Sequence, residues 1–135
     1  MASVDRLEMI QITQRCSLKS YVTHKRLSRD SKSAALKSLF ARSTQLYLEI
    51  YGLLGRLLPA SNNEAGLFSL PDFSLIAGSD SDRSRLEKVS LLDAYVLDLL
   101  RLVITRIEDR NIRYPLSSKV ASLQIIHDRM KELQA

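Results

Sequence analysis

The chain contains a single cysteine, Cys16, which excludes an internal disulfide and the zinc sites that need several cysteines. It has only four glycines and three prolines among 135 residues. Strands joined by tight turns usually need more of both, so the composition favours helices. A continuous apolar segment, the mark of a secretory signal, is missing from the N-terminal residues MASVDRLEMIQ. Together these absences predict a cytoplasmic protein.

Long apolar runs are also missing. The most apolar stretch spans residues 91–104 and is interrupted by Asp93, Asp98 and Arg101. A membrane-spanning helix needs roughly 20 predominantly apolar residues. The sequence therefore predicts no transmembrane helix and no membrane partner.

The residues that are present have the balance of one globular domain. Hydrophobic residues make up 45% of the chain and charged residues 26%, and 135 residues are enough to form a single core. The whole chain, residues 1–135, is therefore predicted to be one domain. Its net charge of +5 is concentrated at the start, because residues 1–42 contain nine basic and three acidic side chains.

Apolar residues recur every three or four positions in four segments, which is the spacing of amphipathic helices. This periodicity predicts helices at about 4–27, 31–58, 82–110 and 116–134. In the first helix, the expected apolar face consists of Leu7, Ile10, Cys16, Leu18, Tyr21 and Val22. The sequence therefore predicts an all-α fold, and most simply a four-helix bundle.

Polar and proline residues mark the boundaries of these helices. Asp30 and Ser31 offer N-cap side chains for the second helix, and residues 80–82 offer them for the third. Pro59 ends the second helix, and residues 111–115 separate the third from the fourth.

The connections predict how the helices are ordered. The first and last connections are short, which makes each pair of joined helices antiparallel neighbours. The connection over residues 60–81 is long and contains large apolar side chains, namely Leu67, Phe68, Leu70, Phe73, Leu75 and Ile76. We expect this segment to pack across the bundle, and its length permits a crossover that leaves the second and third helices parallel.

Two polar residues fall on apolar helix faces. Asp93 lies four residues after Val89 in the third helix, and His127 lies four residues after Leu123 in the fourth. Both are candidates for burial at about the same level of the hairpin, where they could pair. One interpretation is a metal or proton-transfer site. The other is a structural hydrogen bond between two buried polar groups.

Motifs of known catalytic sites are missing. A carboxylate-bridged di-metal bundle needs an E-x-x-H pair on each of two helices, but Tyr21 precedes His24 and Gln124 precedes His127 at that spacing. Cys16 and His24 are eight residues apart on one helix, about 12 Å along its axis, which is too far for mutual activation. The sequence predicts no enzyme, no catalytic residue and no cofactor.

A basic cluster surrounds the predicted first turn. It consists of Lys25, Arg26, Arg29 and Lys32. Such a cluster can hold the phosphate groups of a nucleic acid or another anion. The alternative is an ordinary solvated surface, because no aromatic residues interleave with these charges as they do in a base-stacking site.

Three stretches of the chain carry a family resemblance: SYVTHKRLSRD before the first turn, SAALKSLFARSTQLYLEIYGLL in the second helix and VASLQIIHDRMKEL in the fourth. The shared positions are Leu36, Lys37, Leu39 and Phe40, with His127 and Asp128 near the end. They resemble a bacterial ferritin-like four-helix-bundle family of unknown function. The resemblance implies a ferritin-like bundle, often oligomeric, with a long connection between its second and third helices.

The resemblance also implies that the metal centre is degenerate. Only His127 carries over as a functional position of that family, and Asp93 falls near an acidic position of its third helix. The acidic residues expected in the first helix are replaced by Cys16, Ser17 and Leu18. A member of this kind lacks most ligands of a di-metal site.

Three hypotheses for function follow. The first is a non-enzymatic bundle that acts through self-association or a protein partner, over the apolar parts of its second and third helices. The second is a ferritin-like metal-binding protein whose degenerate site uses Asp93 and His127. The third is binding of an anion or a nucleic acid by the basic cluster at the first turn.

Overall fold

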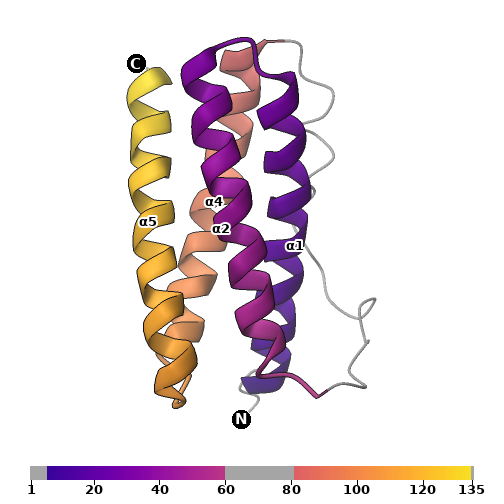
Figure 1. Cartoon of the computed structure of the whole chain (residues 1–135), viewed down its shortest axis with the longest axis vertical. Helices are drawn as coiled ribbons and strands as arrows, with labels where there is room; N and C mark the ends of the chain where they lie inside the picture. The colour runs from indigo at the N-terminus through magenta and orange to yellow at the C-terminus, as the bar shows by residue number, and fades with distance from the viewer. Residues whose placement is uncertain (1–5, 60–80, 135) are drawn as a thin grey trace.

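The computed structural model describes residues 6–59 and 81–134 of the chain, and these residues form an all-α bundle of four helices (Figure 1). The helices are α1 (Arg6–Asp30), α2 (Ala34–Gly55), α4 (Asp82–Ile104) and α5 (Arg110–Gln134). The predicted fold class, an all-α four-helix bundle, is therefore confirmed.

The helices run side by side, and each packs mainly against two neighbours (Figure 1). Helix α1 packs against α2 and α4, and α5 packs against the same two helices. In Figure 1, α1 and α5 run upward while α2 and α4 run downward, so every neighbouring pair is antiparallel and the diagonal pair α2 and α4 is parallel. This is the crossover arrangement that the long connection permits. The expected packing of residues 60–80 lies outside the described residues.

Helix α2 begins later than the sequence predicted. Helix α1 continues to Asp30, and the backbone amide of Ser31 still donates to the Leu27 carbonyl over 2.9 Å. The N-cap of α2 is Ser33, whose hydroxyl accepts from the Leu36 amide, so the prediction of Asp30 and Ser31 as caps was wrong. For α4 the predicted cap is confirmed at Ser81, which accepts from the Ser84 amide.

The hairpin between α4 and α5 also differs from the prediction. Helix α4 ends at Ile104 rather than near residue 110, and α5 begins at Arg110 rather than at residue 116. The Asp109 side chain accepts from the amide of Asn111 over 2.9 Å, which starts α5 early. Pro115 therefore lies inside α5 as its sixth residue, and the helix continues through it although the proline has no backbone N–H to donate.

Large aliphatic residues of all four helices fill the core, but α1 contributes a polar face. Its buried residues include Thr13, Ser17, Ser20 and His24, whereas Leu7 and Val22 of the predicted apolar face are exposed. The hydroxyls of Thr13 and Ser17 donate to carbonyls one turn earlier in α1, over 2.8 and 2.9 Å. These residues are small and satisfied within their own helix, so the middle of α1 can be buried between the apolar Met9, Ile10 and Leu27 without further large side chains.

Among the described helices, none has a stretch of the length and hydrophobicity that crossing a bilayer requires.

Candidate functional site

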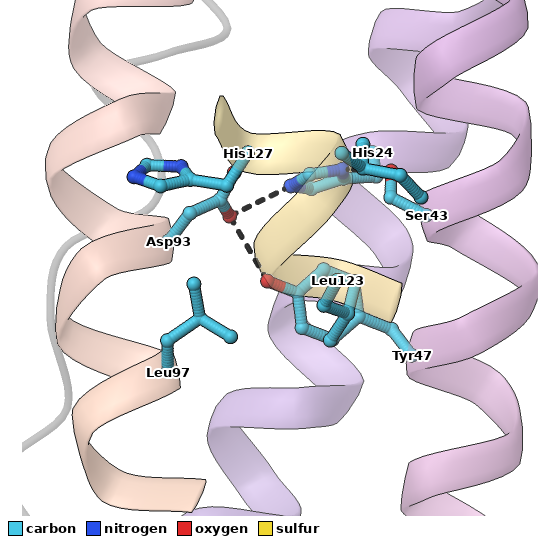
Figure 2. Close-up of a pocket in the computed structure, with 8 residues that line it drawn as sticks. His24, Ser43, Tyr47, Asp93, Leu97, Leu123 and His127 are labelled. Atoms are coloured by element: carbon cyan, nitrogen blue, oxygen red, sulfur yellow. Dashed lines mark hydrogen bonds and ion pairs between the residues drawn. The ribbon is translucent and has the colours of Figure 1, made fainter. Parts of the chain in front are cut away.

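A group of buried polar side chains lies at the centre of the bundle, and we call it the polar cluster. Each of the four helices contributes at least one member (Figure 2). All members are at most 4% exposed, and leucine and isoleucine side chains of α4 and α5 enclose them. The polar cluster consists of His24 from α1, Ser43 and Tyr47 from α2, Asp93 from α4 and His127 from α5.

Asp93 is the acceptor at the centre of the polar cluster. One of its carboxylate oxygens, Oδ1, lies 2.8 Å from Nε2 of His24 and 3.1 Å from the Tyr47 hydroxyl. Figure 2 shows both contacts as dashed lines that meet at Asp93. A single carboxylate therefore joins α1 and α2 to α4. Buried polar groups are stable when they are paired in this way.

The second ring nitrogen of His24 extends the hydrogen-bonded chain to Ser43. With Asp93 ionised, two proton arrangements satisfy all these groups. If only Nε2 of His24 carries a hydrogen, the Ser43 hydroxyl donates to Nδ1. If both nitrogens carry hydrogens, Ser43 Oγ accepts from Nδ1 and donates to the Phe40 carbonyl, 3.0 Å away. In both arrangements Nε2 donates to Asp93.

Aromatic rings hold the imidazole of His24 in place. Its ring meets those of Phe40 and Tyr47 edge to face, with ring centroids 5.4 and 5.0 Å away. These contacts fix the plane of the ring, so that its two nitrogens point at Asp93 and Ser43. The orientation of His24 is thus set by both packing and hydrogen bonding.

His127 lies beside this network without joining it. Its Nδ1 atom is buried and has no hydrogen-bond partner in the part of the chain that the structure describes. Burial lowers the pKa of His127 below its ordinary value, although the nearby carboxylates of Asp93 and Asp128 oppose that shift. The imidazole is therefore neutral at neutral pH. The structure places Asp93 and His127 in one cluster as the sequence suggested, but Asp93 pairs with His24 and Tyr47 instead.

Burial also changes the acidity of the Tyr47 hydroxyl. Desolvation and the adjacent Asp93 carboxylate raise the pKa of Tyr47 well above its usual range. Ser20 lies close enough to lower that pKa slightly, yet its hydroxyl has no partner of hydrogen-bond geometry among the described residues. Tyr47 is therefore a permanent hydrogen-bond donor to Asp93.

The order of contacts from Ser43 through His24 to Asp93 is the order found in serine nucleophiles activated by a histidine. The surroundings do not suit that chemistry, because the space between these side chains cannot hold a water-sized group. Within the described ranges, no three His, Cys, Asp or Glu side chains are placed to hold a metal ion. What the arrangement does is join α1, α2 and α4 by hydrogen bonds at one level of the core, with His127 of α5 packed beside them.

The predicted anion-binding residues Lys25, Arg26, Arg29 and Lys32 are all exposed around the turn between α1 and α2. The backbone amides of this turn already have an acceptor. The Asp82 carboxylate of α4 accepts from the amides of Lys32 and Ser33 over 3.1 and 3.0 Å. Arg29 also lies 3.4 Å from the Asp30 carboxylate. The turn thus contains internal anions beside its basic side chains.

Sequence reasoning missed His24 as a member of the polar cluster. A signal was present, because His24 lies four residues after Ser20 and three before Leu27, which are both buried on α1. That face has few large apolar residues, so periodicity of hydrophobicity did not reveal it.

Cys16 is on the same face and fully buried, and burial raises the pKa of its thiol to about 11.

A second feature lies on the opposite side of α4 from the core. Leu91, Tyr95 and Leu102 are 76%, 38% and 44% exposed, and their spacing of four and seven residues places them on one stripe of the helix. Tyr95 and Leu102, with Asp98 and Leu99, line a shallow hollow there. We call the surface formed by Leu91, Tyr95, Asp98 and Leu102 the outer α4 face.

Comparison with known proteins found no protein family, no curated protein and no solved structure that matches this chain.

Proposed function

We propose that this chain is a non-enzymatic association module that binds a protein surface through the outer α4 face. The observation that carries the proposal is the apolar stripe itself. Helix α4 buries Val89, Val96 and Leu100 on its core side and also exposes Leu91 on its solvent side. A helix that is apolar on both sides is normally covered on both sides.

The pattern of exposed apolar residues distinguishes α4 from the other helices. Scattered single apolar residues are normal on any protein surface. Helix α1 exposes Leu7 and Val22, and α5 exposes Tyr114, Ile125 and Leu133, but on each helix these side chains lie two or more turns apart. On α4 three large exposed apolar side chains share one stripe over three turns, which is typical of helices that dock on another helix.

The polar cluster supports the non-enzymatic part of the proposal. Its hydroxyl and imidazole groups are at most 4% exposed and enclose no space for a substrate. Its hydrogen bonds between α1, α2 and α4 suit a role in stabilising a rigid scaffold. A rigid scaffold keeps the outer α4 face in one geometry, which lowers the entropic cost of binding.

The experiment that tests this proposal places a photo-reactive benzoyl-phenylalanine at position 91 of the full chain, in cells that produce the protein. The control has the same group at position 41, an exposed alanine on α2, diagonally across the bundle. We expect a discrete protein adduct from position 91 and none from position 41. Equal yields at the two positions, or no intermolecular adduct at 91, would contradict the proposal.

A further inference from the structure

We propose that the partner of the outer α4 face is a second copy of this chain, packed antiparallel about a two-fold axis that passes between Tyr95 and Asp98. This inference rests on the function proposed above and specifies the partner. It follows from the order of side chains along the stripe, which is complementary to itself when the direction of the helix is reversed.

The stripe extends beyond its apolar centre to Glu87 at one end and Arg106 at the other. Lys88, which is exposed beside Glu87, already has an interaction partner. Glu87 lies four residues before Leu91, and Arg106 lies four residues after Leu102, in the hydrogen-bonded turn that follows α4. Both are exposed. The stripe therefore spans about 28 Å at ~1.5 Å per residue. Its residues in order are Glu87, Leu91, Tyr95, Asp98, Leu102 and Arg106.

Reversal about the midpoint of residues 95 and 98 exchanges these positions in pairs. In an antiparallel dimer each residue then faces its mate on the other copy, as the isologous rule for two-fold interfaces requires. Leu91 meets Leu102 of the partner subunit, and Glu87 meets Arg106 of the partner subunit. Tyr95 meets Asp98 of the partner subunit, to which its hydroxyl can donate.

The parallel alternative is electrostatically unfavourable. Two parallel copies of α4 would place Glu87 against Glu87 and Arg106 against Arg106, so like charges would face one another at both ends of the stripe. The two Asp98 side chains lie near the middle of the stripe in either direction and do not distinguish the two arrangements. Like charges at an interface oppose association and select against the wrong arrangement. The charges of this stripe therefore favour the antiparallel dimer.

Within one chain, Glu87 and Asp98 of the stripe form exposed ion pairs with neighbouring arginines. Glu87 lies 3.4 Å from Arg83, and Asp98 lies 3.4 Å from Arg101, in pairs that are largely exposed to solvent. Exposed pairs of this kind contribute little to stability. Replacing these intrachain ion pairs by contacts across a dimer interface therefore costs little free energy.

The first test measures the mass of the purified full chain by light scattering over a range of concentrations. We expect a concentration-dependent dimer that Leu91→Glu weakens by at least about tenfold, because a charge would be buried in an apolar contact. Ala41→Glu is the matched control on α2 and should leave the dimer unchanged.

The second test determines the direction of packing with the variants Leu91→Cys and Leu102→Cys. The native thiol of Cys16 is fully buried and its pKa is about 11, so it does not compete. A short bis-maleimide should cross-link a mixture of the two variants and neither variant alone. In an antiparallel pair, equivalent positions are separated by about eleven residues or ~16 Å along the axis, beyond the reach of the reagent.

The ionic ends of the stripe give a third readout. Glu87→Arg alone should weaken the dimer about fivefold, because it faces Arg106 of the partner subunit. Combining it with Arg106→Glu restores the opposite charges and should return the dissociation constant to near its original value. Failure of the double variant to recover would contradict the antiparallel register.

Other outcomes separate this inference from the function on which it rests. A strict monomer, together with a photo-adduct at position 91 to a different protein, would overturn the second copy but keep the association surface. Cross-linking of either cysteine variant with itself would overturn the antiparallel packing. A photo-adduct between position 91 and residues 60–80 of the same chain would overturn both proposals.

Discussion

At the scale of single residues, the Asp93 carboxylate links three helices, because one oxygen accepts from His24 of α1 and from Tyr47 of α2. The hydrogen bonds of a buried carboxylate offset much of the free energy that its removal from water costs. The same carboxylate without a partner is strongly destabilising, since it has lost its water and gained nothing in return. The stability of the bundle therefore depends on keeping Asp93 fully paired.

His24→Leu is expected to lower the free energy of unfolding by about 3–5 kcal/mol, because it leaves the buried Asp93 carboxylate with Tyr47 alone. Tyr47→Phe removes one hydrogen bond and should cost about 1.5–3 kcal/mol. Urea unfolding at neutral pH measures both. The double variant His24→Leu with Asp93→Leu removes both polar partners and should recover most of the loss. A His24→Leu variant no less stable than Tyr47→Phe would show that Asp93 does not need the imidazole.

The lowered pKa of His127 predicts a loss of stability in mild acid. The unfolded histidine binds its proton near pH 6.5, whereas the buried one binds it only at a lower pH. As the pH falls through about 6.5, the unfolded state therefore gains protons first and the free energy of unfolding decreases. Urea unfolding between about pH 7.5 and pH 5.5, where carboxylates scarcely titrate, measures this dependence.

His127→Leu is the control for that pH dependence. It removes the titrating group and keeps an apolar side chain at the buried position, so the stability of the variant should change less over the same range. An unchanged pH dependence in this variant would assign the effect to other groups.

The sequence predicted part of this residue-scale picture. The positions of Asp93 and His127 within apolar stripes predicted that both are buried, which is confirmed. Their hydrogen-bond partners were not predictable, because the partner depends on how each helix rotates about its axis. His24 in particular lies on a face of α1 that it shares with Ser17 and Ser20. Because these residues are polar, hydrophobic periodicity does not detect that the face is buried.

At the scale of elements, Asp82 connects the start of α4 to the turn between α1 and α2. Its carboxylate accepts from the amides of Lys32 and Ser33, which belong to a different hairpin. The adjacent Arg85 donates from its guanidinium to the Asp30 carbonyl. The beginnings of α2 and α4 are therefore held at the same end of the bundle.

Asp82→Ala should reduce the free energy of unfolding by about 1–3 kcal/mol, because it leaves two backbone amides of the turn without their acceptor. Asp128→Ala is the matched control, since the Asp128 carboxylate is exposed and accepts from Gln124 on its own helix. The control should change stability by less than about 0.5 kcal/mol. Thermal unfolding of the two variants makes the comparison. Equal decreases in the free energy of unfolding would show that the contacts of Asp82 with the turn do not stabilise the bundle.

Local signals predicted the existence of the helices better than their ends. The long, strongly periodic segments became α2 and α4, and Ser81 caps α4 as expected. Pro115 was wrongly predicted to precede the last helix, because α5 starts at the Asp109 cap and continues through the proline. Asp30, Ser31 and Ser33 all have side chains that can cap α2. The choice of Ser33 accompanies a tertiary contact, because the Asp82 carboxylate of α4 accepts from the Ser33 amide.

At the scale of the whole molecule, each described helix runs opposite to the two helices that pack beside it. Antiparallel neighbours place opposite ends of the helix dipoles side by side, which is favourable. Parallel α2 and α4 lie on a diagonal and meet through side chains at the central axis, as in the Tyr47–Asp93 hydrogen bond. The polar cluster then falls where side chains from all four helices reach the central axis.

Removal of metal ions should leave this architecture unchanged. The carboxylate that a ferritin-like site would need is occupied by His24 and Tyr47, and in residues 6–59 and 81–134 no three-ligand group exists. We expect protein purified without chelators to contain no stoichiometric iron, manganese or zinc, and EDTA to leave its unfolding midpoint unchanged. Elemental analysis and thermal unfolding check this. One bound ion per chain, with a midpoint that falls on chelation, would restore the metal-binding hypothesis.

By itself, the sequence determined the helical class, the approximate course of the four helices and the burial of Asp93 and His127. These properties depend on spacing along one helix, which a single segment encodes locally. Only the tertiary structure decided that Asp93 pairs with His24 and Tyr47, and that Leu91 faces outward beside Tyr95 and Leu102. Those outcomes depend on the rotation and order of helices, which are set by packing between residues far apart in the chain.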